Sequence, residues 1–228
     1  MRLVSWQQLP DEMRNDSVRP YYDLLRGKRG SLFFKRVFDI VASFLMIVML
    51  SPVLIVLSIW IKADSKGPVM FRQTRVTQYQ KEFRVFKFRT MVVNAESIGA
   101  QVTGDRDPRI TRVGNKLRNF RLDELPQLFN VFLGDMSFVG TRPEVPRYVS
   151  AYSKEMLATL LLPAGVTSKA SIEFKDEAEL LKDAEDVDKA YIEKVLPEKM
   201  KYNLDSITHF SFWDDIRTMF QTVKAVLH

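Results

Sequence analysis

The chain has 228 residues with no cysteine, two histidines and a formal net charge of +6. This composition excludes disulfides, thiolate nucleophiles and zinc sites built on cysteine, and two histidines cannot form a metal cluster. Neither a GxxxxGK nor a GxGxxG loop is present. Any chemistry must therefore come from carboxylates, hydroxyls, Lys and Arg, either alone or with an oxygen-liking metal such as Mg²⁺.

Charge is distributed unevenly along the chain. Residues 1–36 contain eight Lys/Arg and four Asp/Glu, residues 72–121 contain twelve and four, and residues 171–228 contain eight and thirteen. The basic half therefore predicts an anionic partner, and phosphate on nucleic acid, on a lipid headgroup or on a nucleotide would satisfy it.

Residues 1–36 form the first predicted unit. They combine Trp6, Tyr21, Tyr22 and Leu24 with basic residues. This composition suits a basic interfacial segment lying on lipid headgroups, and a simple solvated extension fits it equally well.

A membrane segment is predicted at residues 37–62. It includes 22 consecutive residues without a charge, 40–61, which is long enough for a helix to cross a hydrocarbon core of roughly 30 Å. A buried helix of a soluble protein is the alternative interpretation.

Ser51 and Pro52 stand at the centre of this segment, where Pro removes one helical hydrogen bond. A single kinked span would tolerate Pro52. However, Lys and Arg flank both ends of the segment, and such residues collect on the cytoplasmic side of a membrane. The charge pattern therefore favours a re-entrant helix-break-helix, which bends at Ser51-Pro52 and leaves by the face it entered.

A β-hairpin is predicted next, with strands at residues 69–75 and 83–89 around a polar turn. Most of its Arg and Lys residues are interpreted as a solvated face. The fold class that results is α+β and mainly helical, with a re-entrant membrane helix-break-helix and a small cytoplasmic domain that contains the hairpin.

Two adjacent carboxylates, Asp123 and Glu124, precede an apolar helix pattern that should end at Gly134. This pattern places Asp123 at or near the N-cap. An N-cap Asp ordinarily does no more than accept a bond from backbone N–H groups, and spacing alone favours that interpretation. The alternative is that the helix N-terminus keeps the carboxylate ionised beside a bound phosphate, where it can act as a nucleophile. The pattern residues are Leu125, Leu128, Phe129, Phe132 and Leu133.

A run of cations leads up to this acidic pair, which is more than a helix cap needs. Arg binds phosphate with two parallel hydrogen bonds, and a diphosphate must be neutralised before a carboxylate can approach it. The turn that contains Arg142 and Pro143 offers a further Arg on stiff backbone. The cations of the run are Arg109, Arg112, Lys116, Arg118 and Arg121.

Six motifs in this order resemble the monotopic phosphoglycosyl transferases of the bacterial sugar transferase family. The resemblance covers residues 35–175, and the motifs are "KRVFDI", "GPVMFRQ", "FRVFKFRTM", "DPRITRVGNKLR", "LDELPQLFNV" and "GDMSFVGTRPE". It implies that the Ser51-Pro52 segment is re-entrant and that Asp123 and Glu124 form a catalytic dyad. It also implies Mg²⁺, with Asp123 as a ligand. The implied substrate- and phosphate-binding residues are Lys87, Arg89, Arg118, Arg142 and Pro143.

The activity implied by the resemblance is transfer of a phosphosugar from a UDP-sugar to polyprenyl phosphate, typically undecaprenyl phosphate. UMP leaves as a covalent aspartyl-phosphosugar forms on Asp123, in the first membrane step of surface glycan assembly. Glu124 would assist the acceptor or hold the metal, and the sequence does not separate these roles. The chain departs from residues common in the family at Thr77, at Thr141 and in the region that begins at Pro163. That last region would help to choose the sugar, so the identity of the sugar is not carried over.

The expected organisation is a catalytic domain at residues 63–175 and an acidic helical C-terminal extension at 176–228. The catalytic domain would lie on the cytoplasmic face of a bacterial inner membrane. Expected partners are the UDP-sugar, polyprenyl phosphate and membrane lipid, with a homodimer also considered. Nucleic acid is not expected, because aromatic residues are not interleaved with the basic ones.

Two other functions compete with this one. A catalytically silent, membrane-anchored anion binder would explain the basic stretch but would not need Asp123 and Glu124. A direct-displacement transferase with a membrane-spanning fold would need several hydrophobic segments, whereas the sequence shows one.

Overall fold

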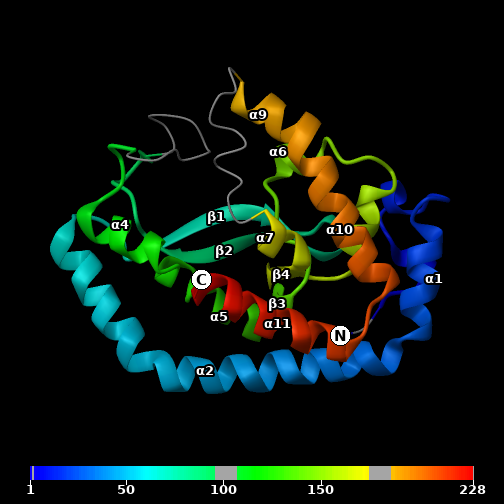
Figure 1. Cartoon of the computed structure of the whole chain (residues 1–228), viewed down its shortest axis with the longest axis horizontal. Coiled ribbons are helices and arrows are strands. Elements are labelled where there is room, and N and C mark those ends of the chain that lie inside the picture. The colour runs from blue at the N-terminus through cyan, green and yellow to red at the C-terminus, as the bar shows by residue number, and fades with distance from the viewer. Residues whose placement is uncertain (2, 96–106, 175–185, 228) are drawn as a thin grey trace.

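The computed structural model describes residues 1, 3–95, 107–174 and 186–227. In these residues the chain is mainly helical, with an antiparallel sheet of β1 and β2 and a parallel sheet of β3 and β4 (Figure 1). The predicted α+β class and the hairpin are therefore confirmed. The first ten residues of the predicted C-terminal extension, 176–185, lie outside the described residues.

The elements in chain order are the short helices η1 (Trp6–Gln8) and η2 (Asp11–Met13), α1 (Arg19–Gly27), α2 (Arg29–Asp64), β1 (Met70–Val76), η3 (Gln78–Gln80), β2 (Glu82–Phe88), α4 (Arg112–Asn119), η4 (Leu122–Glu124), α5 (Gln127–Leu133), β3 (Met136–Val139), α6 (Pro146–Val149), η5 (Met156–Leu161), β4 (Ala164–Thr167), α7 (Lys169–Glu173), α9 (Val187–Ala190), η6 (Tyr191–Val195), α10 (Leu196–Thr208) and α11 (Phe212–Leu227).

Helix α2 is a single helix of 36 residues, roughly 54 Å long at 1.5 Å per residue. The break predicted at Ser51-Pro52 is wrong, because Pro52 lies inside the helix and the helix bends without interruption (Figure 1). Pro52 has no N–H to donate to the carbonyl of Val48, one turn earlier. The hydroxyl of Ser51 donates to that carbonyl instead, at 2.8 Å, so the helix continues past the proline.

Most of α2 is exposed. Among the described residues it is the one helix long and apolar enough to cross a membrane by length and composition, and only 11% of its most apolar window is buried. A core helix of a soluble protein would be mostly buried, so the exposure disfavours that alternative. Its most exposed large apolar side chains include Phe33, Phe34, Leu45, Met49, Ile55, Val56 and Ile59.

The first half of α2 is fastened to the body of the protein by polar contacts. Arg36 donates to the carbonyls of Val131 and Phe132 at the end of α5, at 2.7 and 2.9 Å. One turn later, Oδ1 of buried Asp39 accepts from the Ser137 hydroxyl at 3.1 Å and from the Phe138 N–H at 3.2 Å. These contacts fix α2 against β3 and α5.

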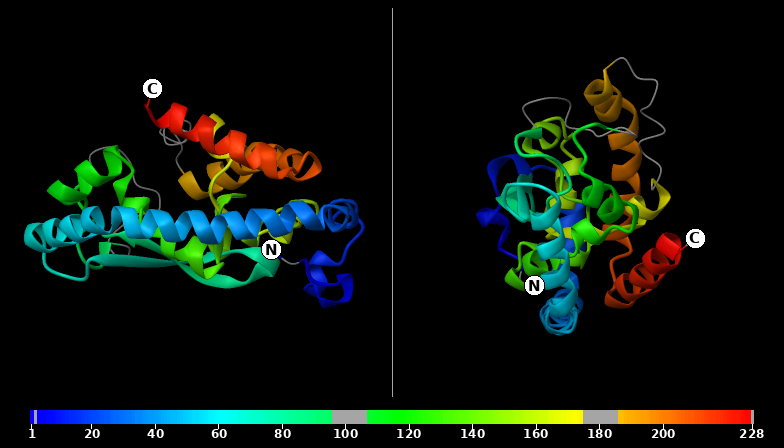
Figure 2. Two further views of the ribbon diagram at one scale, coloured as in Figure 1. Left: turned by 90° about the horizontal axis from the view of Figure 1, so that it is seen from below. Right: turned by 90° about the vertical axis from the view of Figure 1, so that its left-hand side faces the viewer.

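The second half of α2 packs on the same body through apolar contacts. Leu57 and Ile61 are buried in one cluster with Val113 and Leu117 of α4. Both halves of α2 therefore rest on one domain, while the outer face of the helix stays bare (Figure 2).

The N-terminal segment is part of the protein core. Leu9, Met13, Val18 and Leu25 are buried in a cluster that also contains Leu161 of η5. Their apolar surface is thus used inside the protein, and the interfacial role of the segment stays a prediction.

The β-hairpin matches the predicted strands to within one residue at each end. Its turn contains two residues with left-handed backbone, Tyr79 (φ 58°) and Gln80 (φ 60°). Buried Thr77 fixes the turn to the second sheet, because its hydroxyl donates to the carbonyl of Asp135 at 2.6 Å and accepts from the N–H of Ala164 at 3.0 Å.

Helix α5 docks on β2 through a buried amide. The side chain of Asn130 accepts from the N–H of Phe86 and donates to the carbonyl of Arg84, each at 2.9 Å. The helix ends at Gly134, as predicted, with left-handed backbone at φ 97°. Phe132 and Leu133 were predicted on the buried face, but they are 39% and 65% exposed. Phe132 instead extends the apolar surface of α2, since its ring lies 6.0 Å from that of Phe44.

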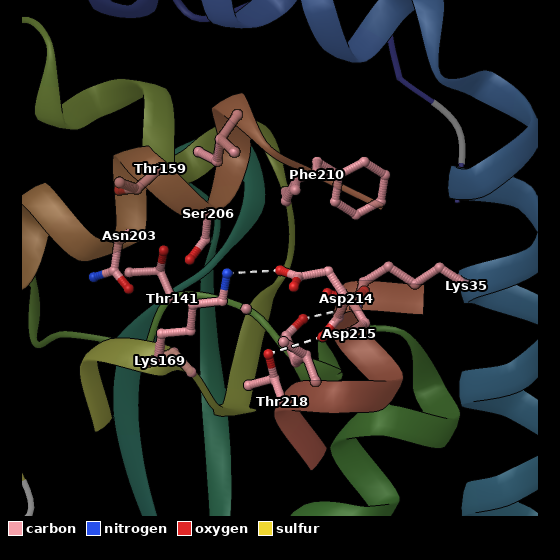
Figure 3. Close-up of a pocket in the computed structure, with 15 residues that line it drawn as sticks. Lys35, Thr141, Thr159, Lys169, Asn203, Ser206, Phe210, Asp214, Asp215 and Thr218 are labelled. Atoms are coloured by element: carbon pink, nitrogen blue, oxygen red, sulfur yellow. Dashed lines mark hydrogen bonds and ion pairs between the residues drawn. The ribbon is translucent and has the colours of Figure 1, made fainter. Parts of the chain in front are cut away.

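A small cavity of about 40 Å³ lies where α2, α7, α10 and α11 meet (Figure 3). Two ion pairs line it: Lys35 with Asp215 at 2.6 Å, and Lys169 with Asp214 at 2.7 Å. Lys35 also donates to the carbonyl of Val139 at 2.8 Å. At this volume the cavity is well below the size of a typical small-molecule site, and it forms a junction between these elements.

Candidate active site

A larger cavity of about 370 Å³ lies between the hairpin, α4 and η4. Its size falls within the usual range for small-molecule sites. One carboxylate, Asp123, lines it among the described residues, together with five cations: Arg75, Lys87, Arg89, Arg109 and Arg118. Such a lining suits a ligand with several negative charges.

Asp123 reaches the cavity from a turn, which corrects its predicted place at a helix N-cap. It lies in the 3-10 helix η4, and α5 begins four residues later, after Pro126. The backbone of Arg121 is left-handed (φ 52°) and separates η4 from α4. The apolar periodicity in the sequence runs across Leu125 and Pro126 without a gap, so it could not reveal this change of direction.

Helix α4 carries Arg118 to the cavity. The helix starts at Thr111, whose side chain accepts from the N–H of Gly114 at 2.9 Å. A Cβ added at Gly114 would lie 2.0 Å from the carbonyl oxygen of Thr90, so only glycine permits this approach of α4 to the end of β2. As a result Arg118 donates from Nε to the hydroxyl of Thr90 at 3.1 Å.

Glu124 is held by two cations. Its Oε1 accepts from Lys87 Nζ at 3.0 Å and from Arg142 at 2.8 Å. Burial acts to raise the pKa of Glu124, but Arg142 and Lys87 outweigh it and hold that pKa well below its usual range. Burial lowers the pKa of Lys87, and the negative charge of Glu124 acts to raise it. We therefore treat Glu124 as an anion whose charge is already compensated.

The pKa of Asp123 is shifted in the opposite direction to that of Glu124. Burial raises its pKa, and the neighbouring charge of Glu124 raises it further, while Lys87 and Arg118 act against both. Two adjacent carboxyl groups whose pKa values are driven apart are typical of sites where they have different roles. Here Glu124 organises cations, and Asp123 faces the cavity.

Four of the predicted site residues, Lys87, Arg89, Arg118 and Asp123, line this cavity. The guanidinium of Arg89 also donates to the carbonyls of Ser65 and Lys66, at 2.9 and 2.6 Å, just after α2. Arg89 therefore ties the end of α2 to the cavity.

Two further predicted site residues, Arg142 and Pro143, are not among the residues that line the cavity. Arg142 contacts Glu124, and the carbonyl of Pro143 accepts from Arg75 at 3.1 Å. These two residues therefore support the charged lining. Pro52 and Ser51 lie away from the site, in α2.

Arg75 was missed by the sequence analysis, which assigned most hairpin cations to a solvated face. It lines the cavity together with Gln73, two residues earlier on β1. Side chains two residues apart share one face of a strand, and the register pairs Phe71, on that same face, with Lys87. Applying this alternation from Lys87 would have placed Arg75 at the site.

The residues offer limited means to hold Mg²⁺. The described residues contain no group of three or more His, Cys, Asp or Glu arranged for a metal ion, and Glu124 is occupied by Lys87 and Arg142. Mg²⁺ commonly binds one or two carboxylates together with substrate phosphates. Asp123 fits that mode when a phosphate-bearing substrate supplies the other ligands.

The cation-lined cavity and the exposed apolar helix α2 belong to one domain, and comparison with known proteins places the chain in a family. Residues 30–228 match the bacterial sugar transferase family, and the chain belongs to that family. The match includes α9, α10 and α11, which the six motifs do not reach.

Three relatives indicate what such proteins do. A UDP-N-acetylgalactosamine-undecaprenyl-phosphate N-acetylgalactosaminephosphotransferase of Aeromonas hydrophila is 37% identical over 86% of this chain and 44% of its own length. A UDP-glucose:undecaprenyl-phosphate glucose-1-phosphate transferase of Escherichia coli is 36% identical over 93% of this chain and 44% of its own length. A Caulobacter vibrioides protein of that same description is 34% identical over 85% of this chain and 69% of its own length. The chain thus spans less than half the length of the first two.

Proposed function

We propose that this protein transfers a phosphosugar from a UDP-sugar to undecaprenyl phosphate or a similar polyprenyl phosphate, with release of UMP. The observation that carries the proposal is the placement of Asp123 in a cavity lined by five cations, next to a Glu124 that Lys87 and Arg142 already neutralise. The names of the relatives supply the donor and acceptor classes. They differ in the sugar, so the sugar is left open.

The proposed reaction has two displacements at one phosphorus atom. A carboxylate oxygen of Asp123 attacks the β-phosphorus of the donor, the bond from that phosphorus to the bridging oxygen breaks, and UMP leaves. A phosphate oxygen of the polyprenyl phosphate then attacks the same phosphorus. The bond to Asp123 breaks, polyprenyl diphospho-sugar leaves, and the carboxylate is regenerated.

The surrounding cations supply the electrostatic part of this proposal. Arg75, Arg118 and Lys87 face the cavity and would neutralise the diphosphate, so that the anionic Asp123 can approach it. Glu124 holds Lys87 and Arg142 at its Oε1, and we assign it this organising role in place of direct attack. Mg²⁺, held by Asp123 and substrate phosphate oxygens, would further neutralise the charge that develops on the transferred group.

The membrane arrangement is part of the proposal. Both halves of α2 pack on the domain that contains Asp123, which favours a re-entrant helix whose two ends lie on one side of the membrane over a helix that spans it. This placement holds the site at the depth of lipid headgroups, where a polyprenyl phosphate presents its phosphate. We place the domain on the cytoplasmic face, because basic residues flank both ends of α2.

Incubating the purified protein with a panel of UDP-sugars, with and without undecaprenyl phosphate, tests the proposal. We expect one molecule of UMP per protein without acceptor and continuous release with it. Failure to release UMP from any donor would favour the anchored anion binder, and release that depends strictly on the acceptor would favour direct displacement.

A further inference from the structure

A buried cluster connects the C-terminal helices to the segment behind the active site. Glu144, which is 6% exposed, accepts from the hydroxyl of Tyr191 at 2.5 Å. Lys199 Nζ donates to that hydroxyl at 3.0 Å and lies 3.7 Å from the Glu144 carboxylate. Tyr191 and Lys199 are themselves buried, so the cluster is an internal polar network of the kind that needs all of its partners.

A rare turn of helix brings Tyr191 and Lys199 to the same face. Eight residues make roughly 2.2 turns at 3.6 residues per turn, which would leave the two side chains about 80° apart around an α-helix. Residues 191–195 form a π-helical turn, which is wider and takes more residues per turn, so it removes part of this offset. Such turns occur frequently at functional sites.

Glu144 also lies next to residues of the candidate active site. It follows Arg142 and Pro143 directly, and its carbonyl accepts from the N–H of Val76 at 2.9 Å. Its carboxylate lies 3.9 Å from the guanidinium of Arg75, which also donates to the carbonyl of Pro143. Glu144 therefore stands between the C-terminal helices and two arginines, one lining the cavity and one bound to Glu124.

We propose that Tyr191 and Lys199 are positioning residues for the UDP-sugar: they hold the Glu144 carboxylate and thereby leave Arg75 directed at the cavity. A buried carboxylate requires compensating donors. With both residues in place, Tyr191 donates a hydrogen bond to Glu144 and Lys199 supplies a positive charge 3.7 Å away. Without Tyr191 and Lys199, Arg75 becomes the main counter-charge of Glu144 and is drawn away from the phosphates of the UDP-sugar. This inference rests on the proposed function, because it concerns binding of the same donor.

The test uses the full chain, five single variants and one double variant. Glu144→Gln is made alone and in combination with Lys199→Met. Tyr191→Phe and Lys199→Met remove the two donors to the cluster. Tyr202→Phe and Lys201→Met are matched controls on the same helix, where Tyr202 is 41% exposed and Lys201 pairs with Glu198 at the surface. Tyr191→Phe is the variant that protects the fold, since it keeps the ring that packs 4.7 Å from the ring of Tyr148.

We expect Tyr191→Phe and Lys199→Met each to raise the KM for the UDP-sugar by about tenfold, a typical coupling between residues of one network, with kcat changed by less than twofold. The controls should leave both constants unchanged. Adding Glu144→Gln to Lys199→Met should return KM toward the wild-type value, because no buried charge then competes for Arg75. A purely structural role of Lys199 would make the double variant worse than either single one.

Failures of the two proposals are distinguishable. If the wild type releases UMP but Tyr191→Phe and Lys199→Met keep the wild-type KM, the positioning role is wrong and the proposed function stands. If the wild type releases no UMP, the proposed function is wrong, and the same variants are compared for binding of inorganic pyrophosphate by calorimetry. Equal pyrophosphate affinity across wild type and variants would then overturn the positioning role as well.

Discussion

Replacing Glu124 with Gln is the most informative change at the charged centre of the site. Gln has nearly the same shape and keeps one carbonyl acceptor, but it removes the negative charge to which Lys87 and Arg142 donate. We expect three effects of this one change: lower stability, weaker use of the donor, and an altered pH dependence of Asp123.

The size of the stability effect follows from the two hydrogen bonds. A hydrogen bond to a charged group contributes about 1.5–3 kcal/mol. The side-chain carbonyl of Gln can still accept one of the two hydrogen bonds, although more weakly. The side chain of Arg142 is also 35% exposed and can turn toward water. Discounting for these two factors leaves about 2 kcal/mol. For a protein of this size that loss lowers Tm by roughly 4–8 °C.

The pH effect follows from the neighbouring carboxyl group. The charge of Glu124 helps to raise the pKa of Asp123, so Glu124→Gln should lower it. Since Asp123 attacks as an anion, the acid limb of the kcat/KM profile for the UDP-sugar should move to lower pH.

Tm by calorimetry and UMP release between pH 4 and 9 measure these effects, with Glu198→Gln at the surface as a control. An unchanged Tm together with an unmoved acid limb would refute the role given to Glu124.

Three further predictions concern Arg142, Asp123 and the arrangement of α2. Arg142→Lys keeps the charge but loses the planar guanidinium, so kcat/KM for the donor should fall roughly tenfold, whereas Arg147→Lys, at an exposed pair, should have no effect on UMP release. In the wild type, burial raises the pKa of Asp123, so activity should fall on acidification at a pH above that expected for an exposed Asp. A Cys introduced at Gln7 should react only with reagents on the cytoplasmic side, and labelling from the periplasmic side would contradict the re-entrant helix. Pro52→Leu should increase the labelling from the periplasmic side.

Local patterns predicted the hairpin and the end of α5 well. Strand alternation and the Gly at position 134 act within a few residues, and the structure shows the strands within one residue of their predicted ends. The start of α5 was predicted wrongly, because Leu125 continues the apolar spacing across the turn at Pro126. Nothing in that spacing records the left-handed backbone of Arg121.

Long-range packing accounts for the other differences. Phe132 and Leu133 fit the helical period, but the side of α5 they occupy adjoins the bare surface of α2. The acidic composition of the C-terminal region gives no sign that Lys199 is buried against Glu144. Contacts between segments more than 50 residues apart leave no local signal in the sequence.

The central claim is that Asp123 forms a covalent phosphosugar adduct, and mass spectrometry of the intact protein and its peptides tests it most directly. After incubation with UDP-sugar and Mg²⁺ but without polyprenyl phosphate, the added mass of one phosphosugar should be found on the peptide that contains Asp123, with one equivalent of UMP released. Asp123→Asn should show neither, although its Tm should equal or exceed that of the wild type, because burial disfavours the charged carboxylate. An Asp123→Asn variant that still turns over the donor, or an adduct found on any other residue, would contradict the claim.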